Sequence, residues 1–295
     1  MKYIWILALF ILFGLQKDAS AELIIHHEGQ WISHITREKV ESKIPGLPIM
    51  DIQEYKKWLD DIDQKTYLAP VNAVIDEDNQ IVPGRTGMKL DRQALTDSFY
   101  HYYYGKGTAE VELPMNIIHP KVDSALLSKI RMKRIGHYET FYNSSNRPRT
   151  HNLALAVNAI NNKVIFPGES FSFNEVLGER TKEKGYMSAP IIVKGEFSEG
   201  IGGGICQVSS TLYNAVDRAG VTIIKRYTHS RNVSYVPPGR DATVSWDGPD
   251  FIFSNKLNEP ILIKAKLHNG QAIVEVFSSN TVQFQPRHVP SVPIK

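Results

Sequence analysis

The residue with the clearest chemical potential is a lone cysteine at the start of a predicted helix. Cys206 is the only cysteine of the chain and follows Ile205 and a glycine run at 202–204. Unpaired backbone N–H groups at a helix N-terminus favour negative charge, so a thiol there is expected to have a lowered pKa. The same N–H groups could hold an oxyanion during acyl transfer. We therefore predict a nucleophilic or redox-sensitive thiol, with a buried small hydrophobic side chain as the alternative.

A nucleophilic thiolate needs a base and usually a group that orients the base. His229 and Asp241 follow Cys206 in the chain, and we expect His229 on a following strand and Asp241 on or beside the next one. This order is reminiscent of papain-like and transglutaminase-like cores. It predicts that Cys206 attacks, that His229 acts as base and acid, and that Asp241 orients His229. A His and an Asp near a turn are more often structural, because chain order does not establish geometry.

The helix that follows the glycine run has one apolar face. Its apolar residues recur with the helical period, and Gly220 ends it: Val208, Leu212, Ala215, Val216 and Ala219. Several polar side chains fall outside this face, and we expect them to line a cleft together with the glycines. The predicted substrate-contacting residues are Gly203, Gly204, Gln207, Ser209, Ser210 and Tyr213.

Composition and spacing argue against several other classes of function. The formal net charge is only +3 over 295 residues, and no block of like charges is present, so nucleic acid is not an expected partner. The glycine run lacks the GK[ST] ending of a phosphate-binding loop. His151, His229 and Asp241 are chemically acceptable metal ligands, but no HExxH or paired-cysteine spacing supports a metal site. We expect no cofactor and no metal.

The N-terminus has the features of an export signal. Lys2 precedes an apolar run at 3–15, and Ala19-Ser20-Ala21 has the small residues of a cleavage site. The apolar run is short for a membrane span, and no second long one follows. We therefore predict cleavage after Ala21, an extracytoplasmic location and no stable membrane span after cleavage; the alternative is a retained anchor.

Periodicity and turn signals predict an α+β protein with two mixed units. In the second unit, the cysteine-bearing helix is expected to pack on a largely antiparallel sheet formed by strands from 221–277. The runs 261–267 and 272–277 should pair around Asn269-Gly270, because Asn-Gly suits a type I′ turn. The expected segments are a signal peptide (1–21), an N-terminal extension (22–64), a small α+β unit (65–125), a linker (126–149), a second domain (150–280) and a loose tail (281–295).

Four long motifs in the second half resemble the VanW family. They are PGESFSFNEVLGERT (167–181), GGGICQVSSTLYNAVDRAG (202–220), HSRNVSYVPPGRDATV (229–244) and DGPDFIFSN (247–255). The resemblance covers roughly 152–277. The small upstream unit is similar to that of the YoaR-like branch, whose N-terminal part resembles domains described as peptidoglycan-binding, and this match covers about 67–119.

The resemblance implies a protein of the cell envelope that is associated with peptidoglycan or a wall precursor. It does not imply a reaction, although the family is named from glycopeptide-resistance clusters. Two functions remain open on the sequence. The first is a wall-binding module. The second is a cysteine-dependent acyl transferase or amidase/peptidase that acts on wall peptides through Cys206, His229 and Asp241.

Overall fold

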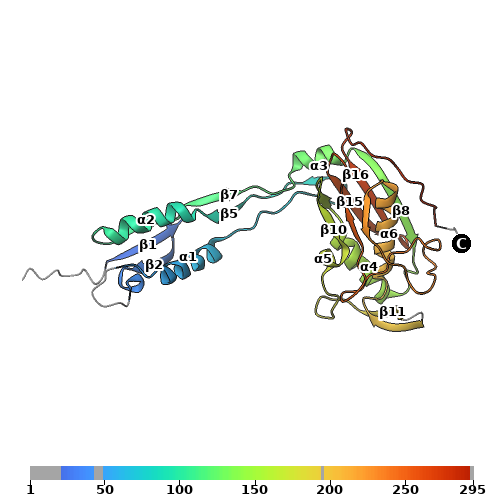
Figure 1. Cartoon of the computed structure of the whole chain (residues 1–295), viewed down its shortest axis with the longest axis horizontal. Coiled ribbons are helices and arrows are strands. Elements are labelled where there is room, and N and C mark those ends of the chain that lie inside the picture. The colour runs from blue at the N-terminus through green and yellow to red at the C-terminus, as the bar shows by residue number, and fades with distance from the viewer. Residues whose placement is uncertain (1–20, 43–48, 194–195, 293–295) are drawn as a thin grey trace, which may run out of the picture. The chain divides into compact units, whose positions relative to one another are not determined.

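The computed structural model describes residues 21–42, 49–193 and 196–292. The predicted signal segment therefore lies, apart from Ala21, outside the described residues. The chain forms two compact units (Figure 1): residues 1–71 with 85–120, and residues 72–84 with 121–295. Six α-helices and several mostly antiparallel sheets occur within the described residues, which confirms the α+β fold class.

The first unit is built on a three-stranded sheet in the order β2-β1-β6. Its elements are β1 (Glu22–His27), β2 (Gln30–Thr36), the 3-10 helix η1 (Glu38–Val40), α1 (Ile52–Thr66), β5 (Gly87–Leu90), α2 (Arg92–Tyr104), β6 (Ala109–Glu112) and β7 (Met115–Ile118). Strand alternation buries Leu23 and Ile25 of β1, and helical spacing buries Trp58 and Ile62 of α1 in the same core. The described elements between 22 and 64 therefore share the core of this unit, which differs from the expected separate extension. The contacts that form this core join residues that are distant in the sequence.

The second unit contains a four-stranded antiparallel sheet in the order β8-β16-β15-β9. These strands are β8 (Lys133–Phe141), β9 (Lys163–Ile165), β15 (Ile261–His268) and β16 (Gln271–Ser278). The other strands are β3 (Val74–Ile75), β4 (Ile81–Val82), β10 (Ser170–Ser172), β11 (Ser188–Val193), β12 (Glu196–Ile201), β13 (Thr222–Lys225) and β14 (Ile252–Ser254). The helices are α3 (Ser124–Ile130), α4 (Arg147–Ile160), α5 (Phe173–Leu177) and α6 (Ile205–Arg218).

The predicted hairpin is confirmed. Strands β15 and β16 pair in antiparallel register, and His268 pairs with Gln271. The two turn residues between them, Asn269 and Gly270, have φ angles of 48° and 75°. Positive φ at both central positions is the requirement of a type I′ turn, which Asn-Gly meets without strain.

Strand β8 corrects the expected linker at 126–149. It pairs with β16 along almost its whole length and carries a close contact with α6. A Cβ atom on Gly136 would lie 2.2 Å from the carbonyl oxygen of Ala215, so this glycine lets the helix backbone approach the sheet. The apolar face predicted for the helix is buried against this sheet. The sequence did not reveal β8 as part of the sheet, because its partner strand lies far along the chain.

The C-terminal segment is irregular but is not loose. Val282 and Val289 are buried, Arg287 donates its backbone N–H to the carbonyl of Arg218, and its guanidinium bonds the carboxylate of Asp217 at 2.8 Å. Prolines suppress regular structure here, yet side-chain hydrogen bonds and small apolar anchors hold the segment on the domain. Within this C-terminal segment, only residues 293–295 lie outside the described residues.

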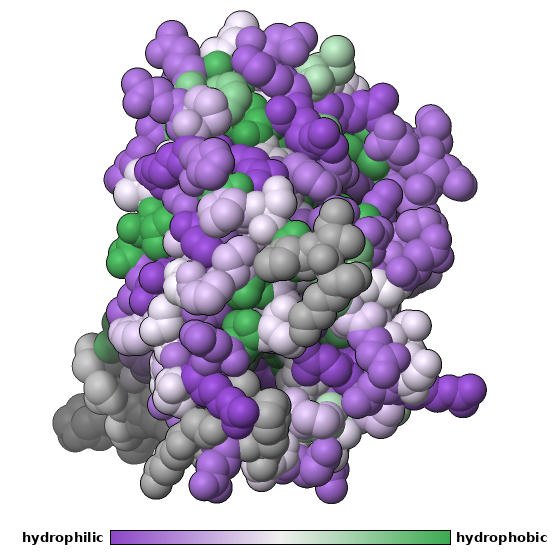
Figure 2. Space-filling view, turned by 90° about the vertical axis from the view of Figure 1, so that its right-hand side faces the viewer, coloured by the Kyte–Doolittle hydropathy of each residue, from purple (hydrophilic) through white to green (hydrophobic). Residues whose placement is uncertain are grey.

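No helix among the described residues is long and apolar enough to cross a membrane. On the face drawn in Figure 2, hydrophilic residues predominate and hydrophobic ones occur in small, separate groups. That face therefore does not present a continuous apolar surface of the kind that marks a large hydrophobic interface.

We expect Gly136→Ala to destabilise the second unit, because the added methyl group would overlap a helix carbonyl that cannot move without shifting α6. Overpacking of this kind costs about 1–3 kcal/mol, and the free energy of unfolding measured in urea should fall by about that amount. Gly248→Ala is the matched control, since its Cβ would meet only the hydroxyl of Ser245, which can rotate away. Equal unfolding midpoints for the two variants would contradict the close contact between α6 and β8.

Candidate active site

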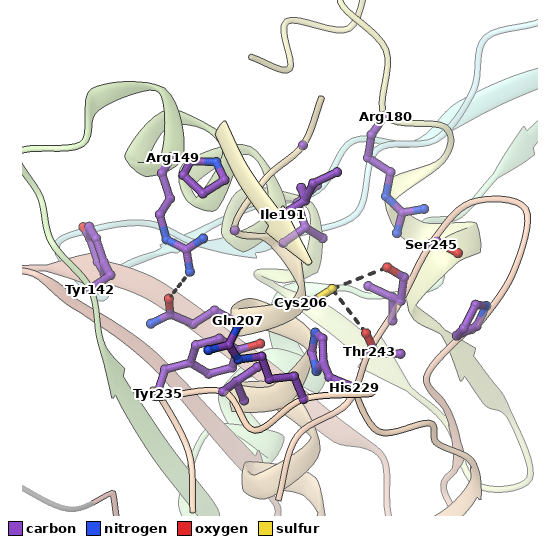
Figure 3. A pocket seen from close by; sticks show the side chains of 18 of the residues that line it. Tyr142, Arg149, Arg180, Ile191, Cys206, Gln207, His229, Tyr235, Thr243 and Ser245 are labelled. Carbon is purple, nitrogen blue, oxygen red and sulfur yellow. Dashed lines mark hydrogen bonds between the residues drawn. The ribbon is translucent and has the colours of Figure 1, made fainter. Parts of the chain in front are cut away.

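The thiol of Cys206 lies in the first turn of α6, at the wall of a cavity of about 1010 Å³. The helix begins after Gly204, whose φ of 109° is suited to glycine and which supplies no side-chain cap. Its first turn therefore has no side-chain acceptor of the usual kind, and the N–H groups of Ile205 and Gln207 donate to the backbone carbonyls of Gly202 and Gly204 instead. Figure 3 shows the sulfur at the centre of the pocket, 3.4 Å from the carbonyl oxygen of Val244 and 3.8 Å from the hydroxyl of Thr243.

Of the other two predicted catalytic residues, His229 interacts with this thiol and Asp241 binds His229. Nδ1 of His229 is 2.6 Å from Oδ2 of Asp241, and the same oxygen accepts the backbone N–H of His229 at 2.6 Å. Both side chains are almost buried, with 7% and 8% of their surface exposed. Because Nδ1 is engaged by the carboxylate, Nε2 is the ring nitrogen left for the hydrogen bond between His229 and Cys206. The structure thus brings Cys206, His229 and Asp241 together.

The pKa values of these three groups shift in a consistent way. Burial opposes the Cys206 thiolate, but the hydrogen bonds with His229 and the Val244 backbone, together with the imidazolium charge, bring the pKa of the thiol below its ordinary value. Burial lowers the pKa of His229, and the hydrogen bonds with Asp241 and Cys206 outweigh it and raise that pKa to about 9. Burial is likewise outweighed at Asp241, where His229 keeps the pKa lowered. The lowered pKa of the thiol and the raised pKa of the imidazole both act in the direction of a thiolate–imidazolium pair.

The strands expected to carry His229 and Asp241 do not form. The segment between β13 and β14, 226–251, contains no strand, so the prediction of two strands there was wrong. Its backbone is instead held by side chains. The Oγ atom of Ser210 accepts the N–H of Ala242 at 2.8 Å, and Nη1 of Arg226 donates to the carbonyl of Asp241 at 2.7 Å. These bonds replace the pairing that a strand would have provided.

Four of the predicted substrate-contacting residues have structural roles instead. Ser209 and Ser210 are fully buried, and both donate to the carbonyl of Cys206. Tyr213 is buried, and the guanidinium groups of Arg226 and Arg240 lie 4.9 and 4.6 Å from its ring centre. At Gly203, a Cβ atom would lie 2.4 Å from the carbonyl oxygen of Ala189. The helical wheel separated polar from apolar positions, but α6 is buried on its polar side as well.

The last two of these predicted residues, Gly204 and Gln207, do line the cavity. Gln207 is only 1% exposed, and its amide is already engaged: the nitrogen donates to Thr140 and Phe141, and the oxygen accepts from Arg149. It therefore positions an arginine and has no free group for a substrate.

Three cavity-lining arginines were missed by the sequence analysis, namely Arg149, Arg180 and Arg231. Nη2 of Arg149 donates to Oε1 of Gln207 at 2.8 Å, and Nη2 of Arg180 donates to Oδ1 of Asn174 at 2.7 Å. Arg180 lies inside one of the long family motifs, but its neighbours Glu179 and Lys182 are also charged, so its charge alone did not set it apart. Arg149 lay in the supposed linker, where nothing in the sequence pointed to it.

The described residues contain no group of three or more His, Cys, Asp or Glu side chains that could hold a metal ion. His151, one of the considered ligands, lies away from the other two. Its Nε2 atom is 3.0 Å from the carbonyl oxygen of Gly185, so the ring has a structural partner.

A cysteine and a histidine at a cavity, with a buried aspartate bound to the histidine, lie on an α+β domain that carries the four motifs, and together these features define the class of protein. A family model described as VanW like protein matches residues 148–277, and this chain belongs to the VanW family. It is similar to the uncharacterized protein YoaR of Bacillus subtilis (strain 168), with 51% identity over 293 residues that cover 99% of this chain and 96% of that protein. The family assignment made from the motifs, including its YoaR-like branch, is confirmed.

A second relative is more distant and matches part of the chain. It is the Vancomycin B-type resistance protein VanW of Enterococcus faecalis (strain ATCC 700802 / V583), 29% identical over 140 residues that cover 46% of this chain and 51% of that protein. No solved structure matches the chain. The comparisons therefore define the family, and the chemistry rests on the geometry of the site.

The reactivity of Cys206 should depend on His229. In the folded protein, iodoacetamide labelling should rise with pH through a pKa below that of an ordinary cysteine, because the imidazolium stabilises the thiolate. His229→Ala should slow labelling at pH 7 by about tenfold for each pKa unit lost. His268→Ala, in the β15–β16 hairpin, is the control. Labelling that requires unfolding would show that Cys206 is a core residue.

Replacement of Asp241 should shift the titration of His229. In Asp241→Asn the imidazolium loses its carboxylate partner, so the pKa of His229 should fall from about 9 toward its ordinary value. A raised folded-state pKa stabilises the fold below the unfolded pKa near 6.5, and this stabilisation is lost as pH rises through about 9. The stability difference between wild type and variant should therefore be larger at pH 6 than at pH 9.5. Imidazole proton resonances measure the pKa, and an unchanged His229 titration would disprove the coupling.

Proposed function

We propose that the second unit is a cysteine-dependent acyl-transfer enzyme that acts on an amide bond. The observation that carries the proposal is that Cys206 and His229 line one cavity, while the buried carboxylate of Asp241 orients His229 through a 2.6 Å bond. A thiolate needs a base held in one tautomer and one orientation, and this arrangement supplies both. The buried alternative for the cysteine is disfavoured by its position on the cavity wall.

The proposed reaction begins with attack of the Cys206 thiolate on the amide carbonyl carbon. A carbon–sulfur bond forms, and the carbonyl oxygen becomes an oxyanion near the N-terminal turn of α6, where the backbone N–H of Cys206 and the helix dipole stabilise it. The carbon–nitrogen bond then breaks, and imidazolium His229 gives its proton to the leaving amine. Water or a second amine attacks the thioester, His229 takes the proton of the attacking group, and the thiolate is regenerated.

The cellular context of the proposal comes from the family and the N-terminal sequence. One relative is named as a vancomycin resistance protein, and the N-terminus has the features of an export signal. We propose that the protein acts outside the cytoplasm, in the cell envelope, and that its substrate is a peptide of peptidoglycan or of a wall precursor. The rival is a wall-binding module with the same partner and no reaction.

Trapping of a covalent intermediate separates the enzyme from the binding module. Purified full-length protein is incubated with stem peptides released from peptidoglycan and quenched in acid, and the intact mass is measured. We expect a mass increase equal to an acyl fragment on Cys206, together with release of the amine fragment. Cys206→Ala should form no adduct. His229→Ala should form it more slowly, because the thiolate is less abundant.

Peptide binding without any adduct or cleaved product, in wild type and in Cys206→Ala alike, would refute the enzyme and support the wall-binding module. The His268→Ala variant serves as the matched histidine control, since that residue lies outside the cavity.

A further inference from the structure

Two arginine side chains pack against the glycine run that precedes Cys206. A Cβ atom on Gly204 would lie 3.0 Å from Cγ and 3.3 Å from Nη1 of Arg149, and one on Gly202 would lie 3.3 Å from Cβ of Arg180. The glycines therefore leave room for the arginines, one on each side of the turn. In Figure 3, Arg149 and Arg180 reach into the pocket from different elements, on either side of the cysteine.

Within the described residues, neither guanidinium group forms an ion pair with a carboxylate, and Asp250 is the one carboxylate whose charge acts on the pKa of Arg180. Arg149 is held by the amide oxygen of Gln207 and Arg180 by that of Asn174. Neutral amides fix the orientation of a guanidinium without cancelling its charge. Glu179 and Asp247 also line the cavity, but within the described residues neither arginine takes part in an ion pair. Nη1 of Arg180 is buried and has no hydrogen-bond partner among the described residues.

A buried donor without a partner is rare and is explained when a ligand completes it. Two oriented guanidinium groups beside a nucleophile form a site for planar oxyanions, because the fork of donors matches the two oxygens of a carboxylate. Keeping these arginines unpaired in a partly buried cavity is unfavourable unless a bound anion is part of the working state. Gln207 and Asn174 also hold the two guanidinium groups in place, so the site is preorganised.

We propose that Arg149 and Arg180 form a carboxylate-recognition site, so that the substrate attacked at Cys206 is a peptide bearing a free carboxylate close to the reacting amide. This proposal specifies the substrate of the proposed enzyme. It rests on the proposed function only in calling the bound carboxylate compound a substrate. The recognition of a carboxylate beside the thiol is a property of the cavity alone, and it can be measured whether or not the protein is an enzyme.

The test compares two alkylating reagents of nearly equal size, iodoacetate and iodoacetamide. Each reacts when the thiolate of Cys206 forms a carbon–sulfur bond and displaces iodide, and only iodoacetate carries a carboxylate. The readout is the ratio of their second-order rate constants, measured by intact mass at pH 7 in the folded protein and in the urea-unfolded protein. A charge-assisted bond of about 1.5–3 kcal/mol corresponds to at least about a tenfold higher ratio in the folded state.

The variants assign the effect to residues. Arg149→Gln and Arg180→Gln should each lower the folded-state ratio several-fold, and Arg180→Lys should retain part of it. Arg134→Gln is the matched control, since it removes one positive charge from a surface ion pair with Glu275 outside the cavity. If the arginines serve only to stabilise the thiolate, both reagents slow equally and the ratio does not change. That result overturns the proposal, as does a folded ratio equal to the unfolded one.

The chemical class of the anion is tested by protection. Acetate should protect Cys206 against iodoacetamide at a lower concentration than acetamide does. Inorganic phosphate that protects far better than acetate would reassign the site to phosphate and overturn the carboxylate. A normal iodoacetate preference in a protein that forms no acyl adduct would leave the carboxylate site standing and refute the enzyme. An acyl adduct without any preference for iodoacetate would support the enzyme and refute the carboxylate site.

Discussion

The candidate site depends on how a helix that is buried on all sides satisfies its polar groups. Helix α6 buries Ser209, Ser210 and Asn214 completely, although none of them is apolar. An unsatisfied buried polar group costs about 1–3 kcal/mol, so each needs a partner. The partners come from the irregular segment before β14: the backbone of Ala242 bonds Ser210, and the carbonyl of Arg240 accepts from Asn214. The polar side of the helix thereby positions Asp241, and through it His229.

This arrangement links packing to electrostatics. The close approach of α6 to β8 at Gly136 sets the position of the helix, and the helix sets the positions of both Cys206 and the loop that carries its partners. Once His229 is held against Asp241 with little exposure, water no longer screens the pair strongly, and the imidazolium is favoured. The lowered pKa of the thiol follows from that imidazolium and from the helix N-terminus together. A substitution in the loop is therefore expected to change the pKa of the Cys206 thiol.

The structural role of the glycine run differs from the substrate contact that its composition predicted. A run of glycines before a helix favours close approach of a substrate to the backbone. Here Gly203 packs on the carbonyl of Ala189, and its neighbours Gly202 and Gly204 give room to Arg180 and Arg149. The cavity beside the thiol is consequently positive on two sides. The thiolate and an incoming carboxylate would both benefit, which is why the proposed test relies on a ratio of reagents and not on a single rate.

The sequence by itself determined the features that depend on neighbours along the chain. The helix after the glycines, its buried apolar face, the Asn269-Gly270 hairpin and the family all follow from local periodicity, turn chemistry or motif order. It also identified Cys206, His229 and Asp241 as candidates, because residue type and chain order are enough to suggest a nucleophile, a base and an orienting group. Tertiary structure decided the rest. The partnership of β8 with β16, the burial of the polar side of α6, and the meeting of Arg149 and Arg180 at one cavity all join residues that are distant in sequence. No local pattern records such contacts, since they arise only when the sheet and the irregular loop close around the helix.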